Sequence, residues 1–232
     1  GSWGASDEDL YNEAHSEFER MQGDGKPFFS LVFTSSNHTP FEFPDGCLDT
    51  IVGERQTADN AIRYSDCALG KFISKAKQSS YWNDTIFVVV ADHDSRAIGS
   101  DLVPIEHFRI PALFLGSDIP IKEDSRLISQ IDIPTTLLSL AGISDKHPML
   151  GFDLSQEIPS NNQRAMLQYN ENFAWLTNEN VVIMKPNTAP KVFLHDGKHI
   201  TEEISPEGFD EKIHTAKTNS LWSSLAYLKS YY

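Results

Sequence analysis

Long apolar runs that stop abruptly at polar residues are the strongest pattern along this chain. Residues 86–91 are six apolar residues in succession, and they predict a strand buried on both faces, as in the middle of a parallel sheet. Residues 28–34 form a second such run, and a helical pattern over residues 57–79 lies between the two. Because a strand, a helix and a strand make a crossover unit, we expect the two strands to pair in parallel.

Other periodic segments complete the expected fold. Helical periodicity predicts three further helices, over residues 6–22, 130–141 and 206–228. Residues 108–116 are expected to form another strand. Pro111 within it indicates an edge position or a kink, because proline cannot donate a ladder hydrogen bond. Four short β-like runs predict a small antiparallel sheet, at residues 164–169, 173–177, 181–185 and 191–195.

The sequence therefore predicts an α/β fold with a mostly parallel central sheet flanked by helices. We expect this α/β core to occupy residues 1–155. Residues 156–232 are expected to hold the small antiparallel sheet and a terminal helix, packed on the same domain.

Polar side chains follow both apolar runs at the point where each run ends. Asp92 and His93 come directly after residues 86–91, and His38 follows residues 28–34. Ligands bind beyond the carboxyl ends of strands in open α/β sheets, so parallel strands would bring these three side chains to one edge. A carboxylate oxygen beside an imidazole nitrogen suits a divalent metal ion. Alternatively, Asp92 caps a turn, His93 hydrogen-bonds to backbone, and His38 is a loop histidine held by Asn37 or Thr39.

Charge narrows the possible partners. The chain has 19 lysines and arginines against 33 aspartates and glutamates, a formal net charge of −14. This charge repels phosphate backbones and anionic lipid surfaces, so we expect no nucleic-acid partner. No apolar run approaches the roughly 18 residues of a membrane-spanning helix, so no membrane contact by this chain is expected. The first residues already read as mid-protein, and we expect a piece of a longer protein.

The two cysteines, Cys47 and Cys67, lie in no Cys-x-x-Cys pattern, so neither a zinc knuckle nor a redox motif is present. A bridge between them would require the loop that carries Cys47 to fold back on the helix that carries Cys67. We favour free thiols.

Four sequence blocks, taken in order, resemble a known family. The blocks are residues 37–41, 64–70, 84–93 and 130–137. Together they resemble the C-terminal half of the sulfatase-like domain of lipoteichoic acid synthases and related phosphoglycerol transferases, in the alkaline-phosphatase-like superfamily. Residues 3–10 are similar to the segment that precedes this half, so the likeness covers nearly the whole chain.

The resemblance implies roles for the matched residues. Asp92 and His93 would give two ligands to a divalent cation, usually manganese or magnesium, and His38 would contact the phosphate or phosphoglycerol group. Such a cation activates a threonine hydroxyl as nucleophile and neutralises charge on the transferred phosphoryl or sulfuryl group. In the family that threonine and a glutamate ligand lie in the N-terminal half, so no catalytic nucleophile is nominated in this chain.

Arg96 stands close to the Asp-His pair, where this chain departs from many relatives. It could bind an anionic oxygen of the substrate, or it could form a surface ion pair with Asp94 or Asp101. Five further histidines in loops or at exposed strand ends are expected to be solvated: His107, His147, His195, His199 and His214.

The resemblance implies a metal-dependent sulfatase-like hydrolase or phosphoglycerol transferase that acts on phosphate or sulfate esters, such as a lipid-linked glycerol phosphate. It would work in the periplasm or on the outer face of the cytoplasmic membrane, anchored through N-terminal helices that lie outside this chain. The missing N-terminal half of the domain would be its partner, and this chain alone is expected to have little or no turnover. The alternative is a non-catalytic scaffold or binding module.

Overall fold

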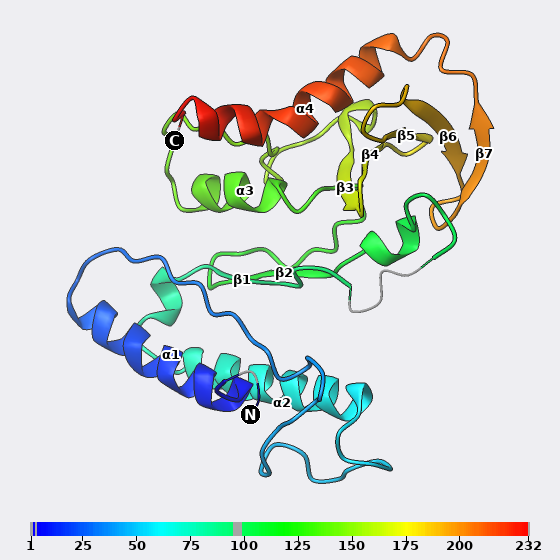
Figure 1. Cartoon of the computed structure of the whole chain (residues 1–232). Coiled ribbons are helices and arrows are strands. Elements are labelled where there is room, and N and C mark those ends of the chain that lie inside the picture. Colours follow the sequence, from blue (N-terminus) through cyan, green and yellow to red (C-terminus); the bar gives the residue numbers. More distant parts are fainter. Residues whose placement is uncertain (1, 3, 95–98, 232) are drawn as a thin grey trace. The chain divides into compact units, whose positions relative to one another are not determined.

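A computed structural model describes residues 2, 4–94 and 99–231 of the chain (Figure 1). Its helices are α1 (Asp7–Gly23), α2 (Ala58–Ala76), α3 (Asp132–Leu140) and α4 (Asp210–Leu228), and its strands are β1 (Phe87–Val90), β2 (Ala112–Leu115), β3 (Ala165–Tyr169), β4 (Asn172–Leu176), β5 (Asn180–Met184), β6 (Lys191–His195) and β7 (Ile200–Ile204). Two compact units result, one of residues 1–85 with 116–118 and the other of residues 86–115 with 119–232. The predicted boundary after residue 155 stays a prediction. No helix in the described part of the chain is both long and apolar enough to cross a membrane.

The first unit is built on two helices that lie side by side, α1 and α2 (Figure 1). Each helix begins at a residue whose hydroxyl accepts a hydrogen bond from a first-turn amide, Ser6 in α1 and Thr57 in α2. Both predicted helix starts are thereby confirmed. Aromatic rings join the helices, because Tyr11 stacks on Phe72 with ring centroids 5.0 Å apart and Phe18 meets the same ring edge-on.

Cys47 and Cys67 form a disulfide bond, with Cα atoms 5.9 Å apart, so the prediction of free thiols is wrong. The loop before α2 folds back on that helix because Phe43 of the loop stacks on Tyr64, with ring centroids 5.1 Å apart. Both rings are buried. This packing brings the two cysteines together, and the spacing of the cysteines in the sequence carries no sign of it.

Removal of this disulfide is expected to lower the free energy of unfolding. The bond joins residues 20 positions apart, and closing a loop of about that size stabilises a folded protein by about 3 kcal/mol. Urea denaturation of the Cys47→Ser, Cys67→Ser variant should show this loss, and reduced wild-type protein should match the variant. Equal stability of the oxidised and reduced proteins would contradict the expectation.

Residues 28–34 form no strand, although their apolar pattern predicts one. One side of the segment is packed, since the Phe28 ring lies 5.5 Å from that of Phe18. The other side is bare, with Phe29, Leu31 and Phe33 exposed by 85%, 79% and 67%. Every strand pair among the described residues is antiparallel, so the expected parallel pairing with β1 is not formed. A strand needs a neighbour for its hydrogen bonds, and an apolar pattern alone cannot supply one.

The second unit contains a two-stranded ladder in which β1 pairs antiparallel with β2, with Phe87 opposite Leu115. Both strands lie where the sequence predicts them, and β2 begins directly after Pro111. Burial on both faces of β1 is not observed. Phe87 is buried, whereas Val90 is 36% exposed, so the strand loses its cover toward its carboxyl end.

A five-stranded antiparallel sheet, in the order β3-β4-β5-β6-β7, forms the rest of this unit with α3 and α4. It confirms the four predicted runs and adds β7, which the sequence did not indicate. Both faces of β5 are buried: Val181 packs in a core with β3 and β4, and Val182 packs with Ala216 of α4 on the other face. Figure 1 shows α4 lying along the sheet, as the predicted terminal helix.

Candidate functional site

Asp92 and His93 lie directly after the carboxyl end of β1, and the structure brings their side chains together. The His93 amide donates a hydrogen bond to Asp92 Oδ1 at 2.8 Å, and Asp92 Oδ2 lies 3.4 Å from His93 Nε2. The side chains are 57% and 76% exposed. A carboxylate oxygen and an imidazole nitrogen therefore face the same small volume of solvent.

The hydrogen bond of the other ring nitrogen fixes which His93 atom can bind a metal. His93 Nδ1 lies 2.8 Å from the carbonyl oxygen of Asp94. Because a carbonyl oxygen only accepts, Nδ1 carries the proton, and Nε2 of the neutral ring keeps its lone pair. Metal-binding histidines usually donate their second N–H in this way. Asp92 Oδ2 and His93 Nε2 thus fit two ligands of one divalent cation.

Two protein ligands are fewer than a divalent cation needs to fill its coordination shell. Within residues 2, 4–94 and 99–231, no group of three or more histidine, cysteine, aspartate or glutamate side chains could hold a metal ion. Manganese and magnesium sites are completed by further oxygen ligands, from protein, water or substrate. The pair would therefore supply only part of the ligand set of such a cation.

Two residues hold the loop that carries Asp92 and His93 in place, and the sequence did not indicate this role for either of them. His107 Nδ1 donates to Asp94 Oδ2 at 2.8 Å, so this histidine is paired and only 34% exposed rather than solvated. The side-chain amide of Gln130 donates to the carbonyl oxygen of Ala91 at 3.0 Å. Both contacts join residues far apart in the sequence, and no motif or spacing signals either of them.

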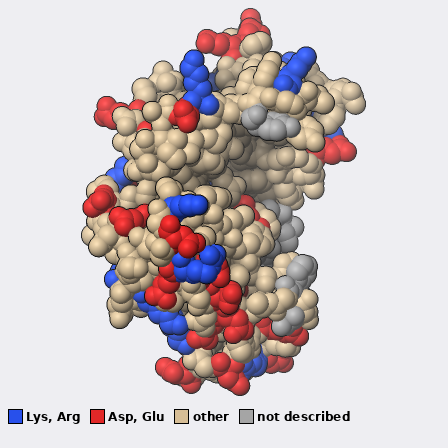
Figure 2. Space-filling view, turned by 90° about the vertical axis from the view of Figure 1, so that its left-hand side faces the viewer, with Lys and Arg blue, Asp and Glu red and all other residues tan. Residues whose placement is uncertain are grey.

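A large hollow opens beside this loop. Its volume is about 1680 Å³, and Asp92, His93 and His107 line it together with apolar side chains such as Leu113 and Ile131. Figure 2 shows a face of the molecule that is hollowed in its upper half and on which acidic side chains outnumber basic ones. Sites for small molecules are usually about 300–1,000 Å³. The hollow thus has room for more than a small ligand.

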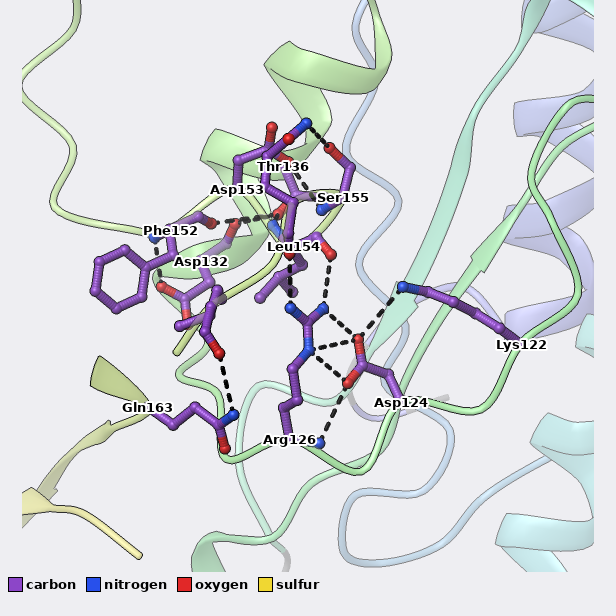
Figure 3. Close-up of polar contacts among 12 residues, drawn as sticks. Lys122, Asp124, Arg126, Asp132, Thr136, Phe152, Asp153, Leu154, Ser155 and Gln163 are labelled. Atoms are coloured by element: carbon purple, nitrogen blue, oxygen red, sulfur yellow. Dashed lines mark hydrogen bonds and ion pairs between the residues drawn. The ribbon is translucent and has the colours of Figure 1, made fainter. Parts of the chain in front are cut away.

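Residues of a polar network line one part of the hollow. Figure 3 shows the contacts of this network. Arg126 donates to the carbonyl oxygens of Leu154 and Gln156 at 2.7 and 2.8 Å and to Asp124 Oδ1 at 2.8 Å. The Thr136 hydroxyl accepts from the Leu154 amide at 2.9 Å. Hydrogen bonds from the Arg126 guanidinium lower the pKa of Asp124 from 3.8 to about 2. The network fixes the segment around Leu154 against α3.

Protonation of Asp124 is expected to weaken the protein at low pH. Because the pKa of Asp124 is lower in the folded state, its ion pair stabilises the fold above the ordinary pKa of 3.8 and loses this effect as the pH falls toward 2. Solvent screening limits the contribution to about 1 kcal/mol. In urea denaturation, Asp124→Asn should be less stable than wild type near about pH 5 and nearly equal to it near about pH 2. A difference that does not depend on pH would contradict this.

His38 lies in the first unit, in the loop that follows residues 28–34. Its amide donates to the Ser35 carbonyl oxygen at 3.0 Å, and its Nδ1 lies 3.0 Å from the Thr39 carbonyl oxygen. A small hollow of about 60 Å³ beside it is lined by serines 2, 6, 35 and 36 and by Glu42, among others. Asp92 belongs to the other unit, so a common edge for the two histidines and Asp92 stays a prediction.

Arg96 lies outside the described residues. Its two interpretations, an anion ligand and a surface ion pair, both stay predictions.

Comparison with solved structures defines the class of fold. The structure superposes on a protein in the alkaline phosphatase superfamily from Vibrio parahaemolyticus with a TM-score of 0.92 and 48% sequence identity, over 100% of this chain and 57% of that one. It superposes on the lipoteichoic acid synthase LtaP from Listeria monocytogenes with a TM-score of 0.71 and 22% identity, over 97% of this chain and 60% of that one. The fold is alkaline-phosphatase-like, which confirms the predicted fold class.

Comparison of sequences then gives the family. The Sulfatase family model matches residues 1–143, and the chain belongs to that family. Phosphoglycerol transferase I from Xanthomonas axonopodis pv. citri is 30% identical over 146 residues, which are 60% of this chain and 21% of that protein. The lipoteichoic acid synthase of Staphylococcus aureus strain USA300 is 26% identical over 149 residues, 55% of this chain and 23% of that protein. The chain spans about a fifth of these relatives, and the resemblance drawn from the four blocks is confirmed.

Proposed function

We propose that this chain is the C-terminal portion of the catalytic domain of a metal-dependent sulfatase-like hydrolase or phosphoglycerol transferase, which acts on phosphate or sulfate esters. Membership of the sulfatase family supports the class of reaction. The observation that carries the proposal is the convergence of Asp92 Oδ2 and His93 Nε2, 3.4 Å apart, with the second nitrogen of His93 bonded to backbone. Manganese or magnesium held there would activate the nucleophile and neutralise charge on the transferred group.

Side chains of this chain would orient both the metal and the substrate. Gln130 and His107 hold the loop that presents Asp92 and His93, so the two ligand atoms need little rearrangement when a cation binds. His38 would donate a hydrogen bond to an oxygen of the phosphoryl or sulfuryl group. Arg96 would bind a further anionic oxygen of the same group.

The nucleophile and the remaining metal ligands would come from an N-terminal half of the domain. Three observations support this partner: the two ligand side chains are mostly exposed, the hollow beside them is wide, and Phe29, Leu31 and Phe33 are bare. An exposed apolar stripe of this kind marks a contact surface. Without that half, this chain would turn over little or no ester.

The disulfide supports an extracytoplasmic place of action. A disulfide such as Cys47–Cys67 forms and persists in oxidising compartments. The periplasm and the outer face of the cytoplasmic membrane are such compartments, and a lipid-linked glycerol phosphate is a substrate that would be reached there.

Titration of the chain with manganese, followed by calorimetry, tests the metal site. We expect weak binding, with a Kd on the order of 10⁻⁴–10⁻³ M, because only two protein ligands contribute. Asp92→Asn and His93→Gln should each weaken it about tenfold or more. His199→Gln is the matched control, since this histidine is also exposed, by 62%, and lies outside the site. Unchanged binding in both site variants would refute the metal site.

A non-catalytic scaffold or binding module is the second candidate. The exposure of both candidate ligands and the lack of a third within the described residues favour it. The two functions differ in the intact protein, where the enzyme would hydrolyse a nitrophenyl phosphate or sulfate in the presence of manganese and the scaffold would not. Robust hydrolysis by this chain alone, abolished by Asp92→Ala, would contradict the assignment of the nucleophile to another segment.

A further inference from the structure

A buried carboxylate at the start of α1 joins three segments of the first unit. Asp7 is only 1% exposed. Its Oδ1 accepts hydrogen bonds from the amides of Ser35 and Ser36, at 3.1 and 3.0 Å, and its Oδ2 accepts from the hydroxyl of Ser65 in α2, at 2.8 Å. The Asp7 amide donates in return to Ser36 Oγ at 3.0 Å. One side chain thereby connects α1, α2 and the loop that leads to His38.

The capping of α1 does not require this carboxylate. Ser6 already caps the helix, since its Oγ accepts from the Asp9 amide. A buried carboxylate without partners destabilises a fold by several kcal/mol, and a serine or alanine at this position would avoid that cost. The donors around Asp7 compensate for its burial. Asp7 therefore contributes something other than capping, namely the hydrogen bonds that it accepts from the amides of Ser35 and Ser36.

The backbone beyond these serines is tightly folded around His38. The His38 amide donates to the Ser35 carbonyl oxygen at 3.0 Å, and the Phe41 amide donates to the His38 carbonyl oxygen at 2.7 Å. Phe41 has a φ of 63°, in the left-handed region that bulky side chains rarely adopt. Such a conformation persists only where its surroundings hold it, and it is frequent at functional sites. The Asp7 contacts supply that hold on the N-terminal side of the turn.

We propose that Asp7 is a positioning residue, which fixes the Ser35–His38 turn so that His38 meets the anionic group of the substrate. The proposal rests on the proposed function of His38 as a substrate contact. Because Asp7 is only 1% exposed, we expect it to act through the turn and not by contact with the substrate. Its removal would leave the His38 side chain present and the turn loosened.

Three variants in the intact protein test this role. Asp7→Ala removes every acceptor of the carboxylate. Asp7→Asn keeps one oxygen for the amides of Ser35 and Ser36. Asp9→Ala is the matched control, because it also removes a first-turn carboxylate from α1 but one that is exposed and bonded to Ser6.

Hydrogen exchange reports on the turn independently of activity. In Asp7→Ala we expect amide exchange of residues 35–41 to be faster by about tenfold or more, an intermediate increase in Asp7→Asn, and wild-type exchange in Asp9→Ala. Exchange in the β3–β7 sheet should stay at the wild-type level and so exclude global unfolding. If Asp7→Ala does not fold, Asp7→Asn alone tests the proposal through its expected intermediate increase in exchange. Wild-type exchange of residues 35–41 in the folded Asp7 variants would overturn the proposal.

Steady-state kinetics separate this role from the function of His38. Asp7→Ala should lower kcat/KM for a phosphate or sulfate ester, Asp7→Asn should restore most of it, and adding Asp7→Ala to His38→Ala should cause no further loss. Additive losses would overturn the proposal. If His38→Ala leaves kcat/KM unchanged while Asp7→Ala still loosens the turn, the proposed role of His38 fails and the hold of Asp7 on the turn stands.

Discussion

Replacement of Asp92 by alanine in the intact protein is expected to lower kcat for a phosphate or sulfate ester by about 10³-fold or more. The change removes one of the two proposed ligand atoms, which lie 3.4 Å apart beside β1. A metal ion contributes several kcal/mol to the transition state of such a transfer, and each 1.36 kcal/mol corresponds to about tenfold in rate. Steady-state hydrolysis of a nitrophenyl ester with excess manganese measures the effect.

A control and a second readout distinguish loss of the metal from loss of the fold. His199→Gln, on an exposed side chain outside the site, should keep wild-type turnover. Because Asp92 is 57% exposed, its replacement should leave the urea midpoint within the small range typical of surface substitutions. Wild-type turnover in Asp92→Ala, or a loss of turnover with unchanged manganese affinity, would contradict the proposed role.

Replacement of Arg164 by alanine is expected to have the largest effect on stability. The guanidinium donates to both oxygens of Asp132, at 2.7 and 2.8 Å, and the two side chains are 4% and 0% exposed. Asp132 also accepts from the amides of Ser129 and Phe152, both at 2.8 Å. Without Arg164 the carboxylate would stay buried with no positive charge beside it, which costs about 3–5 kcal/mol. Urea denaturation should show a loss of this size.

An exposed ion pair provides the control for Arg164→Ala. Lys191 and Glu203 pair across β6 and β7 at 2.9 Å, with side chains 55% and 52% exposed. Lys191→Ala should cost less than about 1 kcal/mol, because exposed pairs are solvated and screened. Similar losses in the two variants would show that burial does not determine the strength of the Arg164 contact.

Elements with local signals could be predicted from the sequence. Ser6 and Thr57 cap helices through atoms a few residues away, so the residue pattern contains the information. The segment at 28–34 has an equally clear apolar pattern, but a strand also needs a partner strand, and the segment's own sequence does not specify one. The strand β7 was not predicted for the opposite reason. It has a partner strand but hardly any apolar pattern, because Glu202 and Glu203 leave only its end residues apolar.

The candidate site likewise has one part that the sequence predicts and another part that it does not. Asp92 and His93 are neighbours after an apolar run, so their approach follows from the local sequence. The supports of the site are long-range contacts: His107 reaches Asp94, Gln130 reaches Ala91, and Asp7 reaches Ser35. Each contact depends on how loops pack in three dimensions. The disulfide between the loop before α2 and that helix was not predicted, because it too depends on how a loop packs.

Pulsed electron paramagnetic resonance of bound manganese most directly tests whether Asp92 and His93 share a cation. With histidine nitrogens isotopically labelled, the spectrum of the wild-type protein should contain a hyperfine coupling to one imidazole nitrogen. The coupling should vanish in His93→Gln and persist in His199→Gln. Bound manganese without a nitrogen coupling, or a coupling that survives in His93→Gln, would contradict the site proposed here.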